Sequence, residues 1–419
     1  MKRIISILLV VFTALSLFAC GAGNTGAPDS SRPGINTSAP DTVEPTGTVV
    51  FEKSFKVAEG IDVKLGFIGK DGAVDTITVE VNGVRTSDVS VYSASQKVLG
   101  RDEAATSDDP ELRFFSEDVN FDGYVDFCIQ SWIKDGATPY YCWFWNTLDK
   151  TFSFGAELED PMLDKTNSRI YCDVTDNGKE YLNVYTVLNG AVSLLGSTAL
   201  DLKPSFSTDL SYYEQYMDPA DRDGYLILAN KEHSLGEDYV PDDLVDINNT
   251  RQDGRATQQM RSTASQALYA LYTEMFAAGY TDVSVTSAYR SAEDQRRIFD
   301  GFLNDNLAAG YDYDTAMAMV LSDTAYPGTS EHQTGLCCDM HSSASADIAR
   351  TEFPRTEAYK WLTENAWKFG FILRYPEDKE EITGYTYESW HYRFVGRYHA
   401  AKMHAMGLCL EEYLDLINK

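Results

Sequence analysis

The chain has 419 residues, so its length alone predicts two to three domains. Its composition, 43% hydrophobic, 24% charged and 12% aromatic, is typical of globular proteins and excludes a disordered chain or a fibrous rod. Its 35 Lys and Arg face 64 Asp and Glu, a formal net charge of −29, which excludes a nucleic-acid partner.

The first residues have the pattern of an export signal. Lys2 and Arg3 precede an apolar run to Phe18, which is short for a membrane span but right for the core of a signal peptide. The run ends at Ala19 and Cys20, and this junction resembles the lipobox of bacterial lipoproteins; an ordinary secretory signal is the alternative. We therefore expect residues 1–19 to be a lipoprotein signal peptide and Cys20 to carry a lipid that anchors the protein outside the cytoplasmic membrane.

Residues 20–48 are mostly Gly, Ser, Thr, Pro, Asn and Asp. Such a segment cannot bury enough apolar surface to offset the entropy of ordering, so we expect a disordered tether.

Six of the seven cysteines lie beyond Cys20, in a compartment that permits disulfides. Six cysteines allow fifteen pairings, and the sequence leaves bridges and buried free thiols equally open.

Residues 49–202 have the pattern of short strands. Ile77–Val81 alternates polar and apolar residues, and Tyr140–Trp145 is a dense aromatic run. Asn-Gly and Asp-Gly pairs at 82–83, 122–123, 177–178 and 189–190 supply the positive φ angles of hairpin turns. We expect a mostly β domain, propeller-like or a sandwich, whose role the residues do not indicate.

One loop of this domain has spaced oxygen ligands. Asp118, Asn120, Asp122 and Asp126 occupy positions 1, 3, 5 and 9, and Gly123 stands at position 6. This spacing suits calcium and resembles Asp-rich EF-hand-like loops, but position 12 lacks the usual glutamate. A calcium site and a turn held by Asx hydrogen bonds are both open.

After a connector at 203–221, residues 222–419 change to longer elements. Apolar residues between Leu268 and Phe276 recur at helical spacing, Val283–Ser287 alternates as a strand, and Ser291 with Asp294 forms a capping box. A helix over 357–369 is expected to end at Gly370, followed by strands at 371–374 and 390–394. We expect an α+β domain with a small antiparallel sheet flanked by helices.

The chemistry lies in two histidine motifs of this domain. His332 precedes Asp339 by seven residues, and His391 follows Glu388 by three. Two imidazoles and a carboxylate form a three-ligand zinc site that leaves room for water, which is typical of catalytic zinc. Glu388, beside the site without being a ligand, is expected to be the general base.

These motifs, preceded by Ser287-Ala288-Tyr289-Arg290-Ser291 and Gln295, resemble the VanY-type D-alanyl-D-alanine carboxypeptidases, zinc peptidases of bacterial peptidoglycan. The resemblance covers about residues 224–419. It implies that the zinc ligands are His332, Asp339 and His391 and that the base is Glu388.

The resemblance also implies a substrate-binding set. Arg290 would pair with the terminal carboxylate of the substrate or stabilise the oxyanion, and both roles are open. The family resemblance also implies that Gln295 and Ser330 line the pocket. Trp390 stands between Glu388 and His391 in sequence, so we expect it in the pocket wall, with a place in the core as the alternative. Position 337, commonly alanine in this family, is Cys337; we expect a small buried residue there, with a metal-binding thiol as the alternative.

We therefore expect a lipid-anchored zinc carboxypeptidase that removes the terminal D-alanine from peptidoglycan stem peptides. One alternative is an L,D-carboxypeptidase acting on tetrapeptide stems, because the motifs are shared between these activities. The other is a wall-binding lipoprotein with a non-catalytic peptidase-like domain, against which the presence of Glu388 and all three ligand positions argues.

Overall fold

The computed structural model describes residues 47–70, 73–90, 114–130, 139–342 and 349–417. The expected signal peptide and Cys20, together with nearly all of the expected tether, lie outside these residues.

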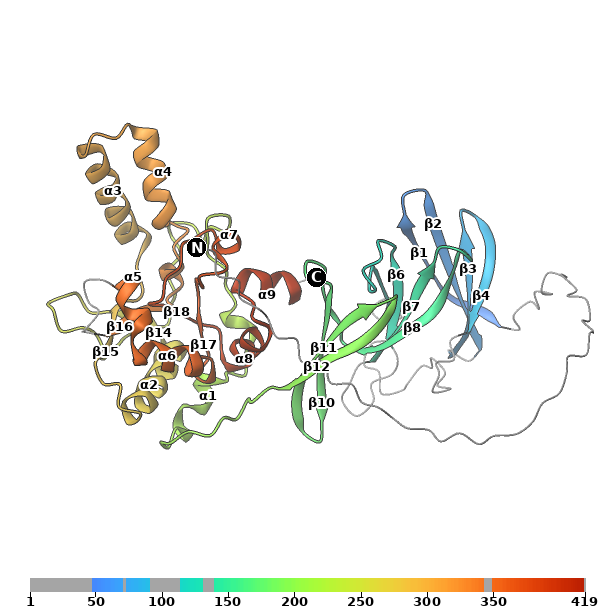
Figure 1. Cartoon of the computed structure of the whole chain (residues 1–419), viewed down its shortest axis with the longest axis horizontal. Helices are drawn as coiled ribbons and strands as arrows, with labels where there is room; N and C mark the ends of the chain where they lie inside the picture. Colours follow the sequence, from blue (N-terminus) through green and yellow to red (C-terminus); the bar gives the residue numbers. More distant parts are fainter. Residues whose placement is uncertain (1–46, 71–72, 91–113, 131–138, 343–348, 418–419) are drawn as a thin grey trace, which may run out of the picture. The chain divides into compact units, whose positions relative to one another are not determined.

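Up to Ala199 the described chain is built from strands (Figure 1). They form three four-stranded antiparallel sheets in which every strand pairs with its neighbour in sequence. The strands are β1 (Thr48–Ala58), β2 (Ile61–Lys70), β3 (Ala73–Val81), β4 (Val84–Ser90), β5 (Phe114–Glu117), β6 (Asp126–Gln130), β7 (Pro139–Asn146), β8 (Thr151–Glu159), β9 (Met162–Asp164), β10 (Arg169–Asp176), β11 (Lys179–Leu188) and β12 (Ala191–Ala199).

Asn-Gly pairs make three of the hairpin turns, as predicted. Asn82, Asn177 and Asn189 have φ of 50°, 50° and 54°, and the glycine after each also has positive φ. Two central residues of positive φ match the twist of the flanking strands. Asp122-Gly123 instead lies within the longer loop that joins β5 to β6.

The two central strands of the middle sheet, β6 and β7, are buried on both faces. Tyr141 and Trp143 pack with the first sheet, and Cys142 and Phe144 pack towards the third. This two-sided burial explains why the run from Tyr140 to Trp145 on β7 is apolar and mostly aromatic and does not alternate with polar residues. The mostly β character of this region is confirmed, whereas the distinction between a propeller-like and a sandwich arrangement stays a prediction.

One disulfide joins neighbouring strands of the middle sheet. Cys128 on β6 and Cys142 on β7 are bonded and stand opposite each other in the strand register. Four further cysteines among the described residues are buried free thiols, so bridge and thiol both occur in this chain: Cys172, Cys337, Cys338 and Cys409.

Beyond residue 200 the described residues form helices and two small antiparallel sheets, which confirms the α+β expectation (Figure 1). The larger sheet has the order β15-β16-β18-β17. Helix α2 contributes Leu268, Leu271 and Met275 to the hydrophobic core that it shares with this sheet. The elements are α1 (Glu214–Met217), β13 (Leu244–Asp246), β14 (Gln259–Arg261), α2 (Ser262–Ala277), β15 (Val283–Ser287), α3 (Ala292–Ala308), α4 (Tyr313–Asp323), β16 (Cys337–Ser342), α5 (Ala349–Glu352), α6 (Glu357–Asn365), β17 (Phe371–Leu373), α7 (Glu380–Thr383), β18 (His391–Phe394), α8 (Arg397–Met406) and α9 (Leu410–Ile417).

The predicted helix boundaries agree with the structure. The Ser291 side chain accepts a hydrogen bond from the Asp294 N–H at the start of α3. The predicted helix over 357–369 is α6 followed by a 3₁₀ turn, and it ends at Gly370, whose φ is 89°. Both helix ends are set by capping residues within one turn of the helix, so they can be predicted from the sequence alone.

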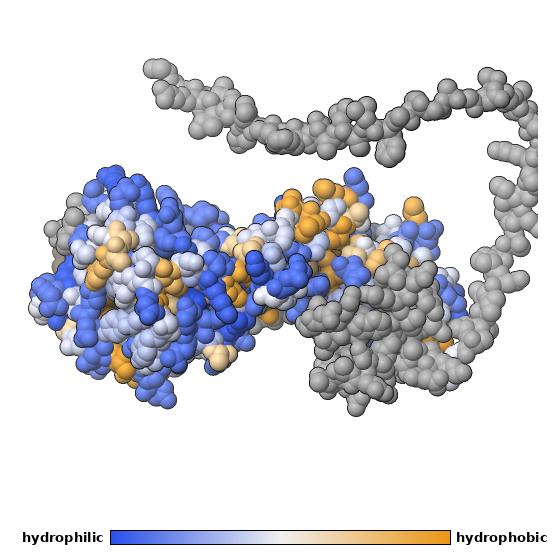
Figure 2. All heavy atoms as spheres, turned by 90° about the horizontal axis from the view of Figure 1, so that it is seen from below, coloured by the Kyte–Doolittle hydropathy of each residue, from blue (hydrophilic) through white to orange (hydrophobic). Residues whose placement is uncertain are grey.

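Figure 2 shows a mainly hydrophilic face with scattered apolar patches, as the large negative charge leads one to expect. Exposed apolar side chains include Leu188, Leu194 and Leu195 on β11 and β12. Within the described ranges, no helix has the length and apolar character needed to cross a bilayer.

Candidate active site

Two neighbouring strands bring Asp339 and His391 together. β16 and β18 are antiparallel, and in their register Asp339 stands directly opposite His391. Side chains of opposed residues in such a pair lie on the same face of the sheet. The pairing therefore joins two motifs that are 52 residues apart in sequence.

His332 reaches the same place from a 3₁₀ turn. The turn, Glu331–Thr334, ends at Gly335, which has φ of 66°. The positive φ favours glycine here, and a Cβ at this position would lie 2.9 Å from the Leu244 side chain, which would have to shift. The turn leads directly into β16, which sets His332 beside Asp339.

Each imidazole is oriented by a hydrogen bond from one nitrogen. His332 Nδ1 lies 2.6 Å from the Ala288 carbonyl oxygen, and His391 Nε2 lies 3.0 Å from Glu331 Oε2. These acceptors assign the N–H to those nitrogens and leave a lone pair on His332 Nε2 and on His391 Nδ1.

The two free nitrogens converge on Asp339. His332 Nε2 lies 3.4 Å from Asp339 Oδ2, and His391 Nδ1 lies 3.2 Å from Asp339 Oδ1. Asp339 Oδ1 is buried without a hydrogen-bond partner of good geometry. Two imidazole nitrogens that face one carboxylate are the donor set of a three-ligand zinc site, so the residues present fit a metal ion.

The electrostatics favour a cation at this point. Burial alone would raise the pKa of Asp339, but the two facing imidazoles outweigh it and hold that pKa well below its usual range. Burial would lower the pKa of His332, yet Cys337 and Asp339 raise it to about 9. This group of residues therefore attracts positive charge.

Glu388 completes the group. It precedes β18, and its Oε2 lies 3.4 Å from His391 Nδ1, with the side chain 16% exposed. The carboxylate therefore borders the site on a side that water reaches. The structure thus brings together His332, Asp339, His391 and Glu388, all of which the sequence had singled out.

Glu331 is a functional residue that sequence reasoning missed. Its side chain is fully buried and bonds to Arg374 at 2.7 Å, to Arg393 at 2.7 Å and to His391 at 3.0 Å. Burial would raise its pKa, but the two guanidinium groups hold that pKa well below its usual range. An ionised Glu331 therefore fixes the His391 ring. The position of Glu331 directly before His332 in the motif could have drawn attention to it, but that position does not show that Glu331 pairs with two arginines and His391.

The predicted substrate residues lie around this group. The Arg290 N–H donates to the His332 carbonyl oxygen, and its guanidinium donates to Gln295 Oε1 at 2.7 Å. Gln295 is almost fully buried, and its side-chain oxygen fixes the position of the Arg290 guanidinium. Ser330 is buried at the start of the 3₁₀ turn, and Trp390 packs partly against the core of this region. Substrate contact by these four residues stays a prediction.

Comparison with known proteins agrees with this geometry. The VanY family model, D-alanyl-D-alanine carboxypeptidase, matches residues 257–397. The YodJ protein of Bacillus subtilis is 37% identical over 196 residues, which cover 46% of this chain and 68% of YodJ. A bifunctional D-Ala-D-Ala dipeptidase and D-Ala-D-Ala carboxypeptidase of Enterococcus gallinarum, VanXYC, is 32% identical over 194 residues, 94% of its length.

The chain belongs to the VanY family. Among solved structures it is similar to a vancomycin resistance D,D-pentapeptidase VanY mutant in complex with Zn(II), at 39% identity and a TM-score of 0.37. That similarity covers 45% of this chain and 98% of the VanY chain. The match of the family model and the two relatives confirms the predicted resemblance to this family for the C-terminal half of the chain.

The Asp118 loop lies outside the VanY match. The two oxygens of Asp126 accept three backbone N–H groups at 2.9, 3.0 and 3.2 Å. Asp118, Asn120 and Asp122 also accept backbone N–H groups of this loop. These bonds are those of the Asx-turn alternative.

We therefore expect added calcium, up to millimolar concentrations, to leave the thermal unfolding midpoint of the full chain unchanged, since the loop oxygens already have partners. A calcium-dependent rise that Asp118→Asn abolishes would restore the calcium alternative. Differential scanning calorimetry of both proteins measures this.

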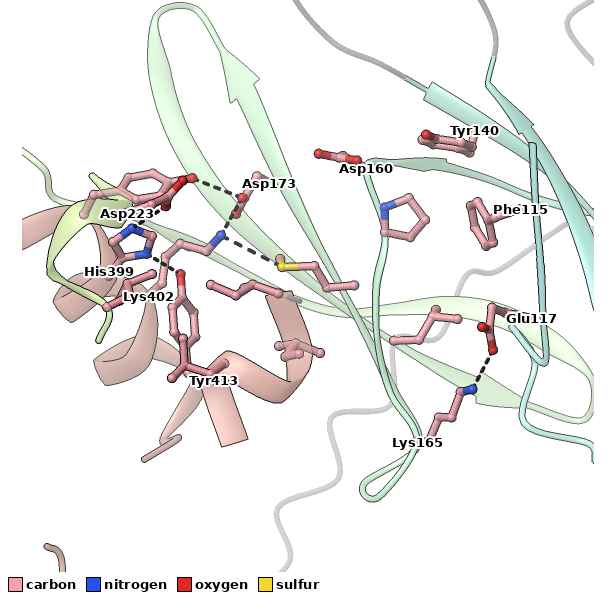
Figure 3. Close-up of a pocket in the computed structure, with 18 of the residues that line it drawn as sticks. Phe115, Glu117, Tyr140, Asp160, Lys165, Asp173, Asp223, His399, Lys402 and Tyr413 are labelled. Atoms are coloured by element: carbon pink, nitrogen blue, oxygen red, sulfur yellow. Dashed lines mark hydrogen bonds and ion pairs between the residues drawn. The ribbon is translucent and has the colours of Figure 1, made fainter. Parts of the chain in front are cut away.

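A separate cavity of about 910 Å³ borders α8 and α9 (Figure 3). His399 lies in its wall, with Nδ1 2.8 Å from the Tyr413 hydroxyl and Nε2 3.3 Å from Asp223. Burial lowers the pKa of His399 to about 4, although Asp223 opposes the shift. His399, which lies just beyond the residues matched by the VanY family model, is thus a buried histidine that is neutral at pH 7.

This burial predicts acid sensitivity. The folded pKa of His399 is below the unfolded value of about 6.5, so the unfolded state binds more protons and stability falls as pH drops from 6.5 towards 4. We expect His399→Gln to remove about 2 kcal/mol of the loss between pH 7 and pH 4.5. Urea unfolding at pH 7 and pH 4.5 tests this against His233→Gln, a change at an exposed histidine that should leave the pH dependence intact.

Proposed function

We propose that this chain is a zinc-dependent carboxypeptidase that hydrolyses the terminal D-alanine from peptidoglycan stem peptides. The observation that carries the proposal is the convergence of His332 Nε2, the Asp339 carboxylate and His391 Nδ1 beside Glu388. VanXYC, a relative that this chain covers almost completely, is named for D-Ala-D-Ala carboxypeptidase activity. The arrangement of these side chains supports metal-dependent hydrolysis, and the similarity to VanXYC supports a D-alanyl-D-alanine substrate.

His332, Asp339 and His391 would hold the zinc ion. A zinc ion bound there supplies Lewis acidity, which polarises a substrate carbonyl and lowers the pKa of water. The second nitrogens of both histidines are fixed by the Ala288 carbonyl and by Glu331, so the ligands are oriented before the metal arrives. Such preorganisation reduces the cost of assembling the site.

Glu388 acts as the general base and acid. It takes one proton from the attacking water, whose oxygen forms a bond to the carbonyl carbon of the terminal amide. It then gives the proton to the nitrogen of the leaving alanine as the C–N bond breaks. Its position at the exposed edge of the site, 3.4 Å from His391, supports this role.

Arg290 is placed to bind the charged end of the substrate. Gln295 and Ser287 hold its guanidinium at 2.7 and 2.9 Å, next to the His332 turn. A fixed guanidinium beside the site favours a terminal carboxylate or a developing oxyanion. We assign Arg290 to substrate binding, and we place Ser330 and Trp390 with it as pocket residues.

We further propose that the enzyme acts outside the cytoplasmic membrane, anchored through lipid on Cys20 by a tether of residues 20–48. The signal-like N-terminus and the lipobox-like Cys20 support this location. A tethered hydrolase would stay beside its wall substrate.

Mass spectrometry of two synthetic stem peptides tests the substrate. One peptide ends in D-alanyl-D-alanine and the other is already shortened by one residue, and each is incubated with the full chain and zinc. We expect one alanine to be lost from the longer peptide. Cleavage of only the shorter peptide would establish the L,D alternative, and no cleavage by zinc-loaded protein would overturn the proposed function.

A further inference from the structure

A cysteine lies within the metal-binding group of residues. Cys337 is the first residue of β16, two before Asp339, so both side chains lie on the same face of the strand. Its thiol is free and completely buried. The next residue, Cys338, points to the opposite face and packs into the hydrophobic core. Of the two adjacent thiols, only Cys337 therefore faces the histidines.

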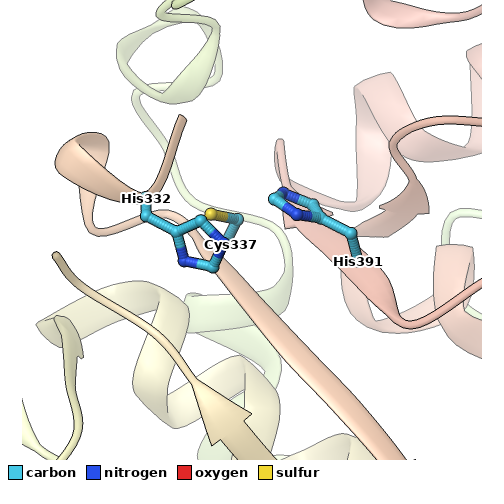
Figure 4. A group of neighbouring side chains, drawn as sticks. All are labelled: His332, Cys337 and His391. Atoms are coloured by element: carbon cyan, nitrogen blue, oxygen red, sulfur yellow. The ribbon is translucent and has the colours of Figure 1, made fainter. Parts of the chain in front are cut away.

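The Cys337 sulfur is close enough to share an ion with both imidazoles. One ligand atom each from His332, Cys337 and His391 lies within 4.8 Å of the others (Figure 4). Zinc bound by sulfur at about 2.3 Å and by nitrogen at about 2.0 Å in a tetrahedron separates the sulfur from each nitrogen by roughly 3.5 Å. Since the separations here are at most 4.8 Å, a movement of at most about 1.3 Å brings the sulfur into bonding range.

The thiol and the Asp339 carboxylate approach the histidines from different environments. The side chain of Asp339 is 15% exposed and that of Glu388 is 16% exposed, whereas Cys337 is fully buried. The two histidines thus belong to two sets of ligands, one completed by a carboxylate at the open edge and one by a thiol at the closed side. Sulfur is the softer donor and prefers softer metals.

We propose that Cys337 is a metal ligand in this chain, which binds the ion of the proposed function from its buried side together with His332 and His391. On binding, the thiol releases its proton to solvent and the thiolate sulfur bonds to the ion. The thiolate takes the place of the Asp339 carboxylate as the third ligand, so a coordination position stays open for water. Because sulfur is a soft donor, this site retains soft divalent ions more tightly than a site with alanine at position 337.

Cobalt substitution tests this directly. In the full-length protein loaded with one Co²⁺ per chain, a thiolate ligand produces sulfur-to-cobalt charge-transfer absorption in the near ultraviolet. We expect that absorption in the wild type and in Cys338→Ala, the matched control, and its loss in Cys337→Ala. A cobalt-loaded wild type without the absorption, or Cys337→Ala that keeps it, would overturn the proposal.

Metal retention gives a second readout. We expect Cys337→Ala to weaken Cd²⁺ binding by tenfold or more in competition with a chelator, and to weaken Zn²⁺ binding less. Equal losses for both ions would contradict the soft-donor role. If the alanine variant does not fold, Cys337→Ser provides the same comparison.

The outcome is separable from that of the proposed function. Charge-transfer absorption without peptide cleavage would leave Cys337 as a ligand and remove the activity. Peptide cleavage by a protein whose cobalt form lacks the absorption would support the proposed function and exclude Cys337 as a ligand.

Discussion

Replacing Glu388 by glutamine is expected to abolish turnover while the metal content stays near one per chain. The amide keeps the size of the carboxylate but cannot take a proton from water, and general acid and base catalysis contributes about 10²–10⁴-fold. Glu388 is not among the three ligand positions, so zinc should remain. Release of D-alanine measured together with metal analysis separates these effects.

The control for this variant is Glu381→Gln, a change to an exposed carboxylate on the neighbouring helix α7. We expect that control to keep full activity. Loss of zinc together with activity in Glu388→Gln would show that Glu388 is a ligand or a structural residue, which would contradict its role as base.

Glu331→Gln is expected to destabilise the fold and weaken the metal site. The change leaves the buried guanidinium groups of Arg374 and Arg393 without a neutralising carboxylate on this side. Removing one partner of a buried ion pair costs about 3–5 kcal/mol. The same carboxylate orients His391, and the loss of such a support typically weakens metal binding by about 10–100-fold.

Urea unfolding and zinc competition measure the two effects. The matched control is Glu352→Gln, which breaks an exposed pair with Arg355 and should cost at most about 1 kcal/mol. Equal stability of Glu331→Gln and the control would show that the buried network contributes nothing. Reduced stability with unchanged zinc affinity would confine Glu331 to a structural role.

The active-site residues were predictable because their motifs are local. His332 with Gly335 and Asp339 describes a turn that leads into a strand, and Glu388 with His391 describes the entry to another strand. The sequence also displayed the turns and helix caps, because Asn-Gly pairs and capping residues act within a few positions.

What the sequence could not supply was pairing at long range. The Asp339–His391 register depends on how β16 meets β18, and the partners of Glu331 come from positions 43 and 62 residues away. The three successive four-stranded sheets of the β region also escaped notice, because their strands and loops differ in length and share no fixed period.

The most direct test of the whole account is zinc-dependent release of D-alanine by the full chain. The purified protein is incubated with a peptide ending in D-alanyl-D-alanine, then with a chelator, and then with added zinc. We predict that one alanine is released, that the chelator stops the release, and that zinc restores it. Release that continues in metal-free protein, or its absence in protein with one zinc per chain, would contradict the assignment of His332, Asp339, His391 and Glu388.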